Sequence, residues 1–322
     1  MMEALAYPAN GPERDLWILN RRPVRNRVDP YVPYAYLAEM ECCETGEPVP
    51  IATIFLTNRE CPWRCAMCDL WKNTLTDSVP VGAIPRQIEY ALSQLPAANQ
   101  VKLYNSGSFF DSQAIPTEDY PAIASLVNAS DRVIVESHPS LIGDRALRFR
   151  DLLHPRLEVA MGLETAHPEA LERLNKRMTT EQFRSAAERL EASGIDLRVF
   201  VLVQPPFVEV GEALFWAERS LDFAFSCDAT AVTLIPTRAG NGAVEALAQI
   251  GAFEAPKLSL VEAALNYGLS LHRGRVFVDL WDIDRVATCP MCRASRVERL
   301  RSMNLAQGIL PSVACDLCGG NP

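Results

Sequence analysis

The sequence predicts an α/β fold: a partial parallel (βα)6 barrel over residues 51–285, with an irregular N-terminal extension and a small cysteine-rich C-terminal tail. Three observations predict it. Six short apolar segments end in polar, glycine or proline residues, as strands buried on both faces of a parallel sheet do. Amphipathic helical patterns lie between these segments, which gives the alternation of strand and helix that a parallel sheet needs. Cysteines then return as two spaced pairs after residue 285.

Residues 1–50 form the expected N-terminal extension. Seven prolines lie in it, and proline interrupts helices and central strands, so no long element is expected. Tyr31, Tyr34 and Tyr36 indicate that the extension packs on the main domain. Four nearby arginines, at positions 21, 22, 25 and 27, give a small basic cluster in a chain whose formal net charge is -9.

The expected barrel strands cover residues 51–56, 101–104, 132–135, 157–163, 197–203 and 231–235. The clearest helix begins after Thr179, where Gln182 completes a capping box and apolar residues recur at helical spacing. Repeated strand–helix units imply right-handed crossovers, and ligands bind at the carboxyl ends of such strands. The polar residues that follow each strand are therefore candidate site residues.

The composition is that of an ordinary globular chain, with 48% hydrophobic and 22% charged residues among 322. The acidic net charge gives no electrostatic footprint for nucleic acid, which disfavours it as a partner. No secretion signal and no apolar run of about 18 residues is evident, so we expect no membrane association and a cytoplasmic location. In such a chain, ten cysteines indicate metal or redox chemistry in preference to disulfides.

Cys61, Cys65 and Cys68 form a C-x3-C-x2-C motif directly after the first expected strand. Thiolates are soft ligands that suit iron–sulfur clusters and zinc. Three of them in one short loop can bind three corners of a cubane 4Fe-4S cluster, which leaves the fourth iron free to coordinate a substrate. A zinc site is the alternative, but it would need a fourth ligand from elsewhere in the chain.

The motif and its position resemble those of radical S-adenosylmethionine (SAM) enzymes, and the resemblance covers about residues 50–285. Within that superfamily the chain is most similar to the group of methylthiotransferases, the Elongator catalytic subunit and the archaeosine-synthesis radical SAM protein. The resemblance implies a 4Fe-4S cluster whose open iron chelates SAM, and an external electron donor such as flavodoxin or ferredoxin. It also implies reductive cleavage of SAM to a 5′-deoxyadenosyl radical, which abstracts hydrogen from a substrate. Met67 stands where the family commonly has an aromatic residue; methionine is apolar and polarizable enough to cover the cluster or the adenine.

The resemblance further implies SAM contacts at successive strand ends. Ser106 and Gly107 occupy the place of the family's glycine-rich motif, where backbone groups would bind the methionine moiety; a simple tight turn is the alternative. Glu164, in a Gly-Leu-Glu sequence, and Glu136 would accept hydrogen bonds from ribose hydroxyls, with surface ion pairs as the alternative. Gln204 ends the fifth strand, where the family has polar or adenine-contacting groups.

Two arginines and two histidines complete the candidates. Arg238 follows the sixth strand and could bind a substrate carboxylate or phosphate, or stabilise its own loop. Arg198, within the fifth strand, is a weaker candidate for the SAM carboxylate. His138 and His167 each precede a proline, and we expect both to start helices.

The tail, residues 286–322, carries Cys289, Cys292, Cys315 and Cys318 as two C-x2-C pairs. Paired motifs of this kind hold zinc in ribbon-like modules, and the same ligands hold auxiliary iron–sulfur clusters. We therefore expect a second metal centre, and the sequence leaves zinc and an auxiliary cluster both open.

These observations predict a radical SAM enzyme that acts on a small-molecule or peptide substrate. One alternative keeps the radical chemistry but makes a tRNA nucleoside the substrate, by analogy with the archaeosine and methylthiotransferase relatives. Another is a non-catalytic iron–sulfur or zinc interaction protein that has lost SAM. The presence of Gly107, Glu164 and Gln204 beside the cysteines disfavours that last alternative.

Overall fold

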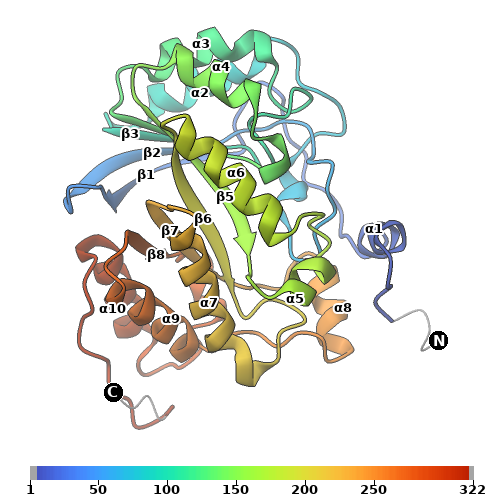
Figure 1. Ribbon diagram of the computed structural model, residues 1–322, viewed down its shortest axis with the longest axis vertical. Helices are drawn as coiled ribbons and strands as arrows, with labels where there is room; N and C mark the ends of the chain where they lie inside the picture. The colour runs from blue at the N-terminus through green and yellow to red at the C-terminus, as the bar shows by residue number, and fades with distance from the viewer. Residues whose placement is uncertain (1–5, 319–322) are drawn as a thin grey trace.

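An eight-stranded sheet curls into an open half-barrel, with helices packed on its convex face (Figure 1). The structure is a computed structural model and describes residues 6–318. The strands lie in sequence order: β1 (Ala35–Cys42), β2 (Pro48–Phe55), β3 (Gln100–Tyr104), β4 (Arg132–Glu136), β5 (Arg156–Glu164), β6 (Asp196–Val203), β7 (Ala231–Pro236) and β8 (Arg275–Val278). β1 is antiparallel to β2, and every later pairing is parallel. The predicted fold class is confirmed.

Helices connect the parallel strands and flank the sheet. They are α1 (Gly11–Leu19), α2 (Ala83–Gln94), α3 (Tyr120–Val127), α4 (Asp144–Leu152), α5 (Pro168–Arg173), α6 (Thr180–Ala192), α7 (Ala213–Ser226), α8 (Ala243–Gln249), α9 (Leu258–Ser270) and α10 (Arg293–Ala306). The predicted capping box opens α6. The Thr179 hydroxyl accepts a hydrogen bond from the Gln182 amide at 3.3 Å, and the Gln182 side chain accepts one from the Thr179 amide at 2.9 Å.

The six predicted strands correspond to β2–β7, and the sheet has two more. β1 lies within the stretch that was expected to be irregular, and β8 was not predicted. Pro48 and Pro50 lie in the part of β2 that pairs with β1, ahead of Ile51, where pairing with β3 begins. Proline lacks an amide donor, so it is tolerated where one side of a strand needs no hydrogen bond.

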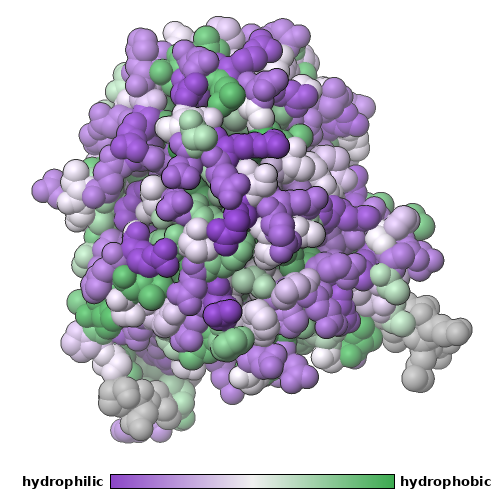
Figure 2. Space-filling view, in the orientation of Figure 1, coloured by the Kyte–Doolittle hydropathy of each residue, from purple (hydrophilic) through white to green (hydrophobic). Residues whose placement is uncertain are grey.

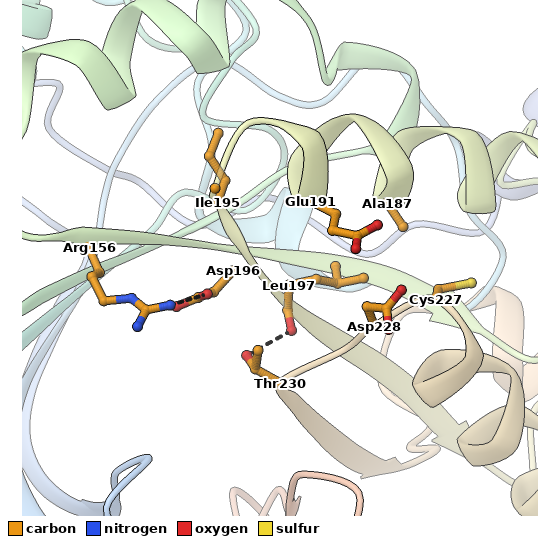
Figure 3. A pocket seen from close by; sticks show the side chains of 10 residues that line it. Arg156, Ala187, Glu191, Ile195, Asp196, Leu197, Cys227, Asp228 and Thr230 are labelled. Carbon is orange, nitrogen blue, oxygen red and sulfur yellow. Dashed lines mark hydrogen bonds and ion pairs between the residues drawn. The ribbon is translucent and has the colours of Figure 1, made fainter.

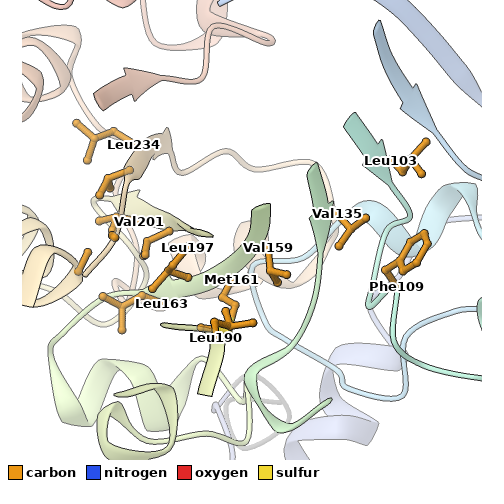
Figure 4. Close-up of a cluster of buried hydrophobic side chains, with 14 of the residues drawn as sticks. Leu103, Phe109, Val135, Val159, Met161, Leu163, Leu190, Leu197, Val201 and Leu234 are labelled. Atoms are coloured by element: carbon orange, nitrogen blue, oxygen red, sulfur yellow. The ribbon is translucent and has the colours of Figure 1, made fainter. Parts of the chain in front are cut away.

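Alternate residues of the strands face the helices and form the main apolar core. Leu103, Val135, Leu163, Val201 and Leu234, one from each of five strands, are buried in it (Figure 4). Their neighbours in sequence point to the concave side, because successive side chains of a strand alternate. The charged and aromatic residues of the strands gather on that concave side.

A buried network of charged side chains fills the concave side at the amino ends of the strands. Glu158 pairs with Arg132, Arg198 and Arg275 at 3.0, 2.6 and 3.1 Å, and Glu41 pairs with Arg198 and Lys102 at 2.6 Å each. Arg198 therefore lies at the end opposite to the strand ends where ligands were expected. Its predicted contact with the SAM carboxylate is wrong, because its guanidinium is buried and already pairs with the carboxylates of Glu41 and Glu158.

α10 covers the edge of the sheet at β8. The Asn304 side chain donates to the Val278 carbonyl at 2.8 Å and accepts from the Val278 amide at 2.9 Å. Gln307 makes the same two bonds with Val276, at 3.1 and 2.7 Å. Two side-chain amides thus take the place of a neighbouring strand, which protects an edge that could otherwise pair with another chain.

The surface seen in Figure 2 is mostly hydrophilic, with apolar side chains scattered in small groups. Among the described residues, no helix combines the length and the apolar character needed to cross a membrane.

Candidate active site

The three predicted cluster cysteines lie in one loop that follows β2, at the carboxyl edge of the parallel sheet. Cys61, Cys65 and Cys68 are half-buried free thiols, and each interacts electrostatically with another of the three. Burial raises the pKa of each thiol to about 12, so without a metal they hold their protons at neutral pH. Metal binding would release those protons, because the thiolate is the ligand.

Residues far away in the sequence hold the backbone of this loop. Asn241, which follows β7, donates its side-chain amide to the carbonyls of Ala66 and Cys68 at 2.8 and 3.1 Å. The Ala66 amide donates to the Leu174 carbonyl at 2.9 Å. The Ala66 side chain is fully buried in a second apolar cluster, which Trp17 of α1 and several residues of α8 share. The cysteine loop is therefore fixed on several sides before any metal binds.

Glu60 ties the N-terminal extension to the cysteine loop. Its carboxylate pairs with Arg22 at 2.7 Å, Arg25 at 2.5 Å and Arg64 at 3.1 Å. Burial raises the pKa of Glu60, but these arginines outweigh burial and lower it, so the carboxylate stays charged at neutral pH. Two arginines of the basic cluster noted in the sequence thus neutralise the residue next to Cys61.

Three residues at strand ends share an uncommon backbone conformation. Ser106, Glu164 and Gln204 have φ angles of 55°, 67° and 56°, in the left-handed region that residues other than glycine rarely adopt. They lie at the carboxyl ends of β3, β5 and β6. Such conformations cost about 1–3 kcal/mol each and concentrate at binding and active sites. Three of the residues predicted to contact SAM thus share one uncommon backbone conformation at the end of a strand.

The loop of Ser106 and Gly107 lies between Glu136 and the cysteine loop. The Glu136 carboxylate accepts hydrogen bonds from the amides of Asn105 at 2.6 Å and Gly107 at 3.4 Å. Burial raises the pKa of Glu136, and these amides oppose the rise. A side chain at Gly107 would meet the β-carbon of Cys61 at 3.3 Å, so glycine lets the two loops lie against each other. Glu136 supports this loop, and its contact with SAM stays a prediction.

Glu164 forms a buried ion pair with Lys176, which follows α5, and each side chain is 10% exposed. Lys176 also interacts electrostatically with Cys65 and Cys61. Gly162 leaves room for the pair, because a β-carbon there would collide with both the carboxylate and the ammonium group. Sequence reasoning missed Lys176, since no local pattern marks it and only the fold brings it to Glu164.

The remaining predicted contacts have protein neighbours of their own. The Gln204 side-chain amide donates to the Val208 carbonyl at 2.9 Å. Arg238 pairs with Asp279 at 2.5 Å, and its other terminal nitrogen is buried without a partner in the part of the chain that is described. Met67 is half-buried in the cysteine loop. The roles of these residues toward SAM or substrate stay predictions.

His138 and His167 begin helices, as predicted. Their ring nitrogens accept hydrogen bonds from the amides of Ser140 at 3.2 Å and Ala170 at 3.4 Å. Trp63 of the cysteine loop stacks on His138, with ring centroids 3.9 Å apart. Burial lowers the pKa of His138 to about 4, so the imidazole in this stack is neutral at physiological pH.

The carboxyl edge of the sheet also carries buried polar atoms that have no hydrogen-bond partner among residues 6–318. Both polar atoms of the Asn105 side chain are of this kind, as are the hydroxyls of Thr57 and Thr237. These residues follow β3, β2 and β7. Because buried polar groups are normally paired, a ligand rich in donors and acceptors would satisfy them. Together with three thiols in one loop, these atoms fit an iron–sulfur cluster and a bound SAM.

The pocket in Figure 3 lies at the other end of the sheet. Its volume is about 220 Å³, and residues at the amino ends of β5 and β6 line it together with α6 and the end of α7. Arg156 and Asp196 form an ion pair there at 2.6 Å. None of the predicted cluster or SAM residues lines this pocket, so it is not the candidate site.

The four tail cysteines come together near α9 and α10. The sulfur atoms of Cys289, Cys292, Cys315 and Cys318 all lie within 4.8 Å of one another, and all four cysteines are free thiols. The ligands of the predicted second metal centre are therefore assembled in the fold.

The half-barrel and its three-cysteine loop resemble those of radical SAM enzymes, as expected from the sequence. The chain is similar to archaeosine synthase subunit beta of Methanosarcina acetivorans, with 25% identity over 283 residues, 81% of this chain and 80% of that protein. It is also 25% identical over 207 residues to an uncharacterised protein of Methanocaldococcus jannaschii, which is 60% of this chain and 57% of that protein. The solved structure of the archaeal Methanocaldococcus infernus Elp3 with an N-terminal deletion gives a TM-score of 0.48 at 14% identity, over 60% of this chain and 51% of that one. No protein-family model matches the chain.

Proposed function

We propose that this protein binds a 4Fe-4S cluster through Cys61, Cys65 and Cys68 and reductively cleaves SAM. The cluster supplies the electron that breaks the sulfonium bond of SAM and yields the 5′-deoxyadenosyl radical. The observation that carries the proposal is the packing of Gly107 against Cys61, which puts a loop with free hydrogen-bonding capacity beside the cysteine loop.

The protein's own residues would bind and orient SAM. Backbone groups of Ser106 and Gly107 would bind the methionine moiety. The Glu136 carboxylate holds this loop by accepting hydrogen bonds from its backbone amides. Glu164 would accept hydrogen bonds from the ribose hydroxyls, and its ion pair with Lys176 fixes the position of the carboxylate. Gln204 would contact the adenine from the end of β6.

For the substrate, we favour a tRNA nucleoside over the small molecule or peptide that the sequence first suggested. The similarity to archaeosine synthase subunit beta favours it. The concave side of the barrel supports it as well, because Phe55, Tyr104 and Phe200 are half-buried there. The ring centroid of Tyr104 lies 6.1 Å from that of Phe55 and 6.1 Å from that of Phe200. Aromatic rings of this kind stack on unpaired bases. A partner subunit belongs to the same proposal, since the relative is named as one subunit. An external electron donor belongs to it as well, because reductive cleavage of SAM consumes an electron.

Product analysis tests both parts of the proposal. Reduced, anaerobically reconstituted protein should form 5′-deoxyadenosine from SAM, and a Cys61→Ala/Cys65→Ala/Cys68→Ala variant should form none. Addition of unmodified tRNA should then raise the yield more than addition of the small-molecule fraction of a lysate. Stimulation by the small-molecule fraction alone would instead support a small-molecule substrate, which agrees with the expectation from the sequence. A well-folded, iron-loaded protein that forms no 5′-deoxyadenosine would support the non-catalytic alternative.

A further inference from the structure

We propose that the four tail cysteines bind a single zinc ion, and that this ion holds the C-terminal segment in place. The proposal does not depend on the SAM chemistry, because its ligands lie outside the cysteine loop of the candidate active site.

The spacing of the sulfur atoms decides between one ion and a cluster. The Cys289 and Cys315 sulfurs are 3.8 Å apart, and those of Cys292 and Cys318 are 3.5 Å apart. Zinc–sulfur bonds of about 2.3 Å put the corners of a tetrahedron about 3.8 Å apart. A cubane cluster separates its thiolates further, since each binds a different iron atom. A disulfide is excluded as well, because its sulfur atoms lie at about 2.05 Å.

Both C-x2-C pairs have the same local geometry. The Cys289 sulfur accepts hydrogen bonds from the backbone amides of Met291 and Cys292. The Cys315 sulfur accepts them from the amides of Leu317 and Cys318. Two equivalent turns thus place backbone amides against the first sulfur of each pair, an arrangement that would orient both pairs toward one ion.

The surrounding charge complements such an ion. One Zn²⁺ with four thiolates carries a net charge of -2. Arg296 of α10 lies 3.9 Å from the Cys318 sulfur and pairs with Glu262 of α9, which Arg299 also contacts at 3.4 Å. Two buried arginines on one glutamate leave one positive charge beside the sulfur atoms. Four protonated thiols without a metal carry no charge, so a nearby positive charge would not stabilise them in the same way.

The segment from residue 312 to residue 318 has few other contacts to hold it. Its side chains are mostly exposed, and the preceding stretch is tied to α10 through Arg299, which donates to the carbonyls of Leu310 at 2.7 Å and Pro311 at 2.8 Å. α10 itself is fixed by Asn304 and Gln307 on β8. Metal binding would therefore supply the free energy that orders the end of the chain, while α10 would stay in place without it.

Metal analysis of the Cys61→Ala/Cys65→Ala/Cys68→Ala variant tests the proposal. We expect a colourless protein with about one zinc per chain and no iron. A Cys315→Ser/Cys318→Ser variant should lose the zinc, and the matched Cys43→Ser variant should keep it. About four irons per chain in the triple variant, with brown colour, would overturn the proposal in favour of an auxiliary cluster. A folded triple variant with no metal would reject the site.

Cobalt substitution of the unmodified protein gives an answer even if the triple variant does not fold. Cobalt at the tail site should show the intense visible absorption of a tetrahedral thiolate site, and the Cys315→Ser/Cys318→Ser variant should lack it. Zinc chelation should open residues 312–318 to protease while the barrel stays intact. Absence of the cobalt bands would contradict a metal site in the tail. A tail whose protease resistance is unchanged after zinc is lost would contradict the claim that the ion holds the C-terminal segment in place.

Discussion

Glu164 and Lys176 form a buried ion pair that occupies the space where a β-carbon of residue 162 would lie. A side chain at residue 162 would therefore have to displace the charged ends of this pair. Lys176 also interacts electrostatically with the thiols of Cys65 and Cys61. One ion pair thus links the candidate ribose-binding residue to the cysteine loop.

Replacing Gly162 by alanine should disrupt this pair. The new β-carbon would displace both charged groups, so we expect SAM affinity to fall by at least about tenfold while the fold persists, as for the loss of one charged hydrogen bond. Isothermal titration calorimetry with SAM measures the change. Gly211→Ala is the matched control, because nothing lies within 4 Å of a β-carbon there. Equal affinity in both variants would remove Gly162 from this role.

Glu164→Gln should weaken SAM binding without loss of iron. A charged hydrogen bond contributes about 1.5–3 kcal/mol, so the dissociation constant should rise by about 10- to 150-fold. Glu169→Gln, on the exposed surface of α5, is the control and should bind SAM normally. Adding Lys176→Gln to the Glu164 variant should cost less than the sum of the two single changes, because the partners are in contact. Strict additivity would mean that the pair does not act as a unit.

Asn241→Ala should loosen the cysteine loop. The variant loses two hydrogen bonds to the carbonyls of Ala66 and Cys68, and so the cluster should be lost faster in air. The decay of the visible absorption of the cluster after exposure to oxygen measures this. Asn128→Ala, at the end of α3, where the side chain accepts a hydrogen bond from the His154 amide, should decay like the unmodified protein. An unchanged decay rate for the Asn241 variant would contradict its role in holding the loop.

Glu158→Gln should destabilise the barrel at neutral pH. Burial raises the pKa of Glu158, but Arg198, Arg275 and Arg132 outweigh burial and lower it to about 2, below its ordinary value of 4.5. The ionised Glu158 carboxylate therefore stabilises the folded protein fully above about pH 4.5, and this stabilisation is lost as the pH falls toward about 2. Removal of one partner from a buried ion pair costs about 3–5 kcal/mol.

Urea denaturation at a series of pH values checks this prediction. The unmodified protein should be more stable than the Glu158→Gln variant near pH 7, and the gap should shrink as the pH falls below about 4.5. A gap that stays constant down to pH 2 would show that the ionised carboxylate is not what stabilises the amino end of the barrel.

Local signals in the sequence predicted much of this structure. The cysteine spacing, the capping box at Thr179 and the helix-starting histidines all depend on residues a few positions apart. The parts that were missed depend on contacts that no local pattern marks: Asn241 lies 175 positions from Ala66, and Lys176 meets Glu164 although α5 lies between them in the sequence. β1 and the start of β2 were missed because prolines surround β1 in the sequence, and Pro48 and Pro50 of its partner β2 look like strand breakers until the pairing pattern is known.

Electron paramagnetic resonance of the reduced protein, with and without SAM, tests the central claim most directly. If Cys61, Cys65 and Cys68 hold a cluster with one open iron, reduction should give a 4Fe-4S signal whose shape changes when SAM is added, because SAM binds that iron. The triple cysteine variant should give no such signal. A reduced-cluster signal that SAM does not alter, or one that persists in the triple variant, would contradict the assignment of these three cysteines.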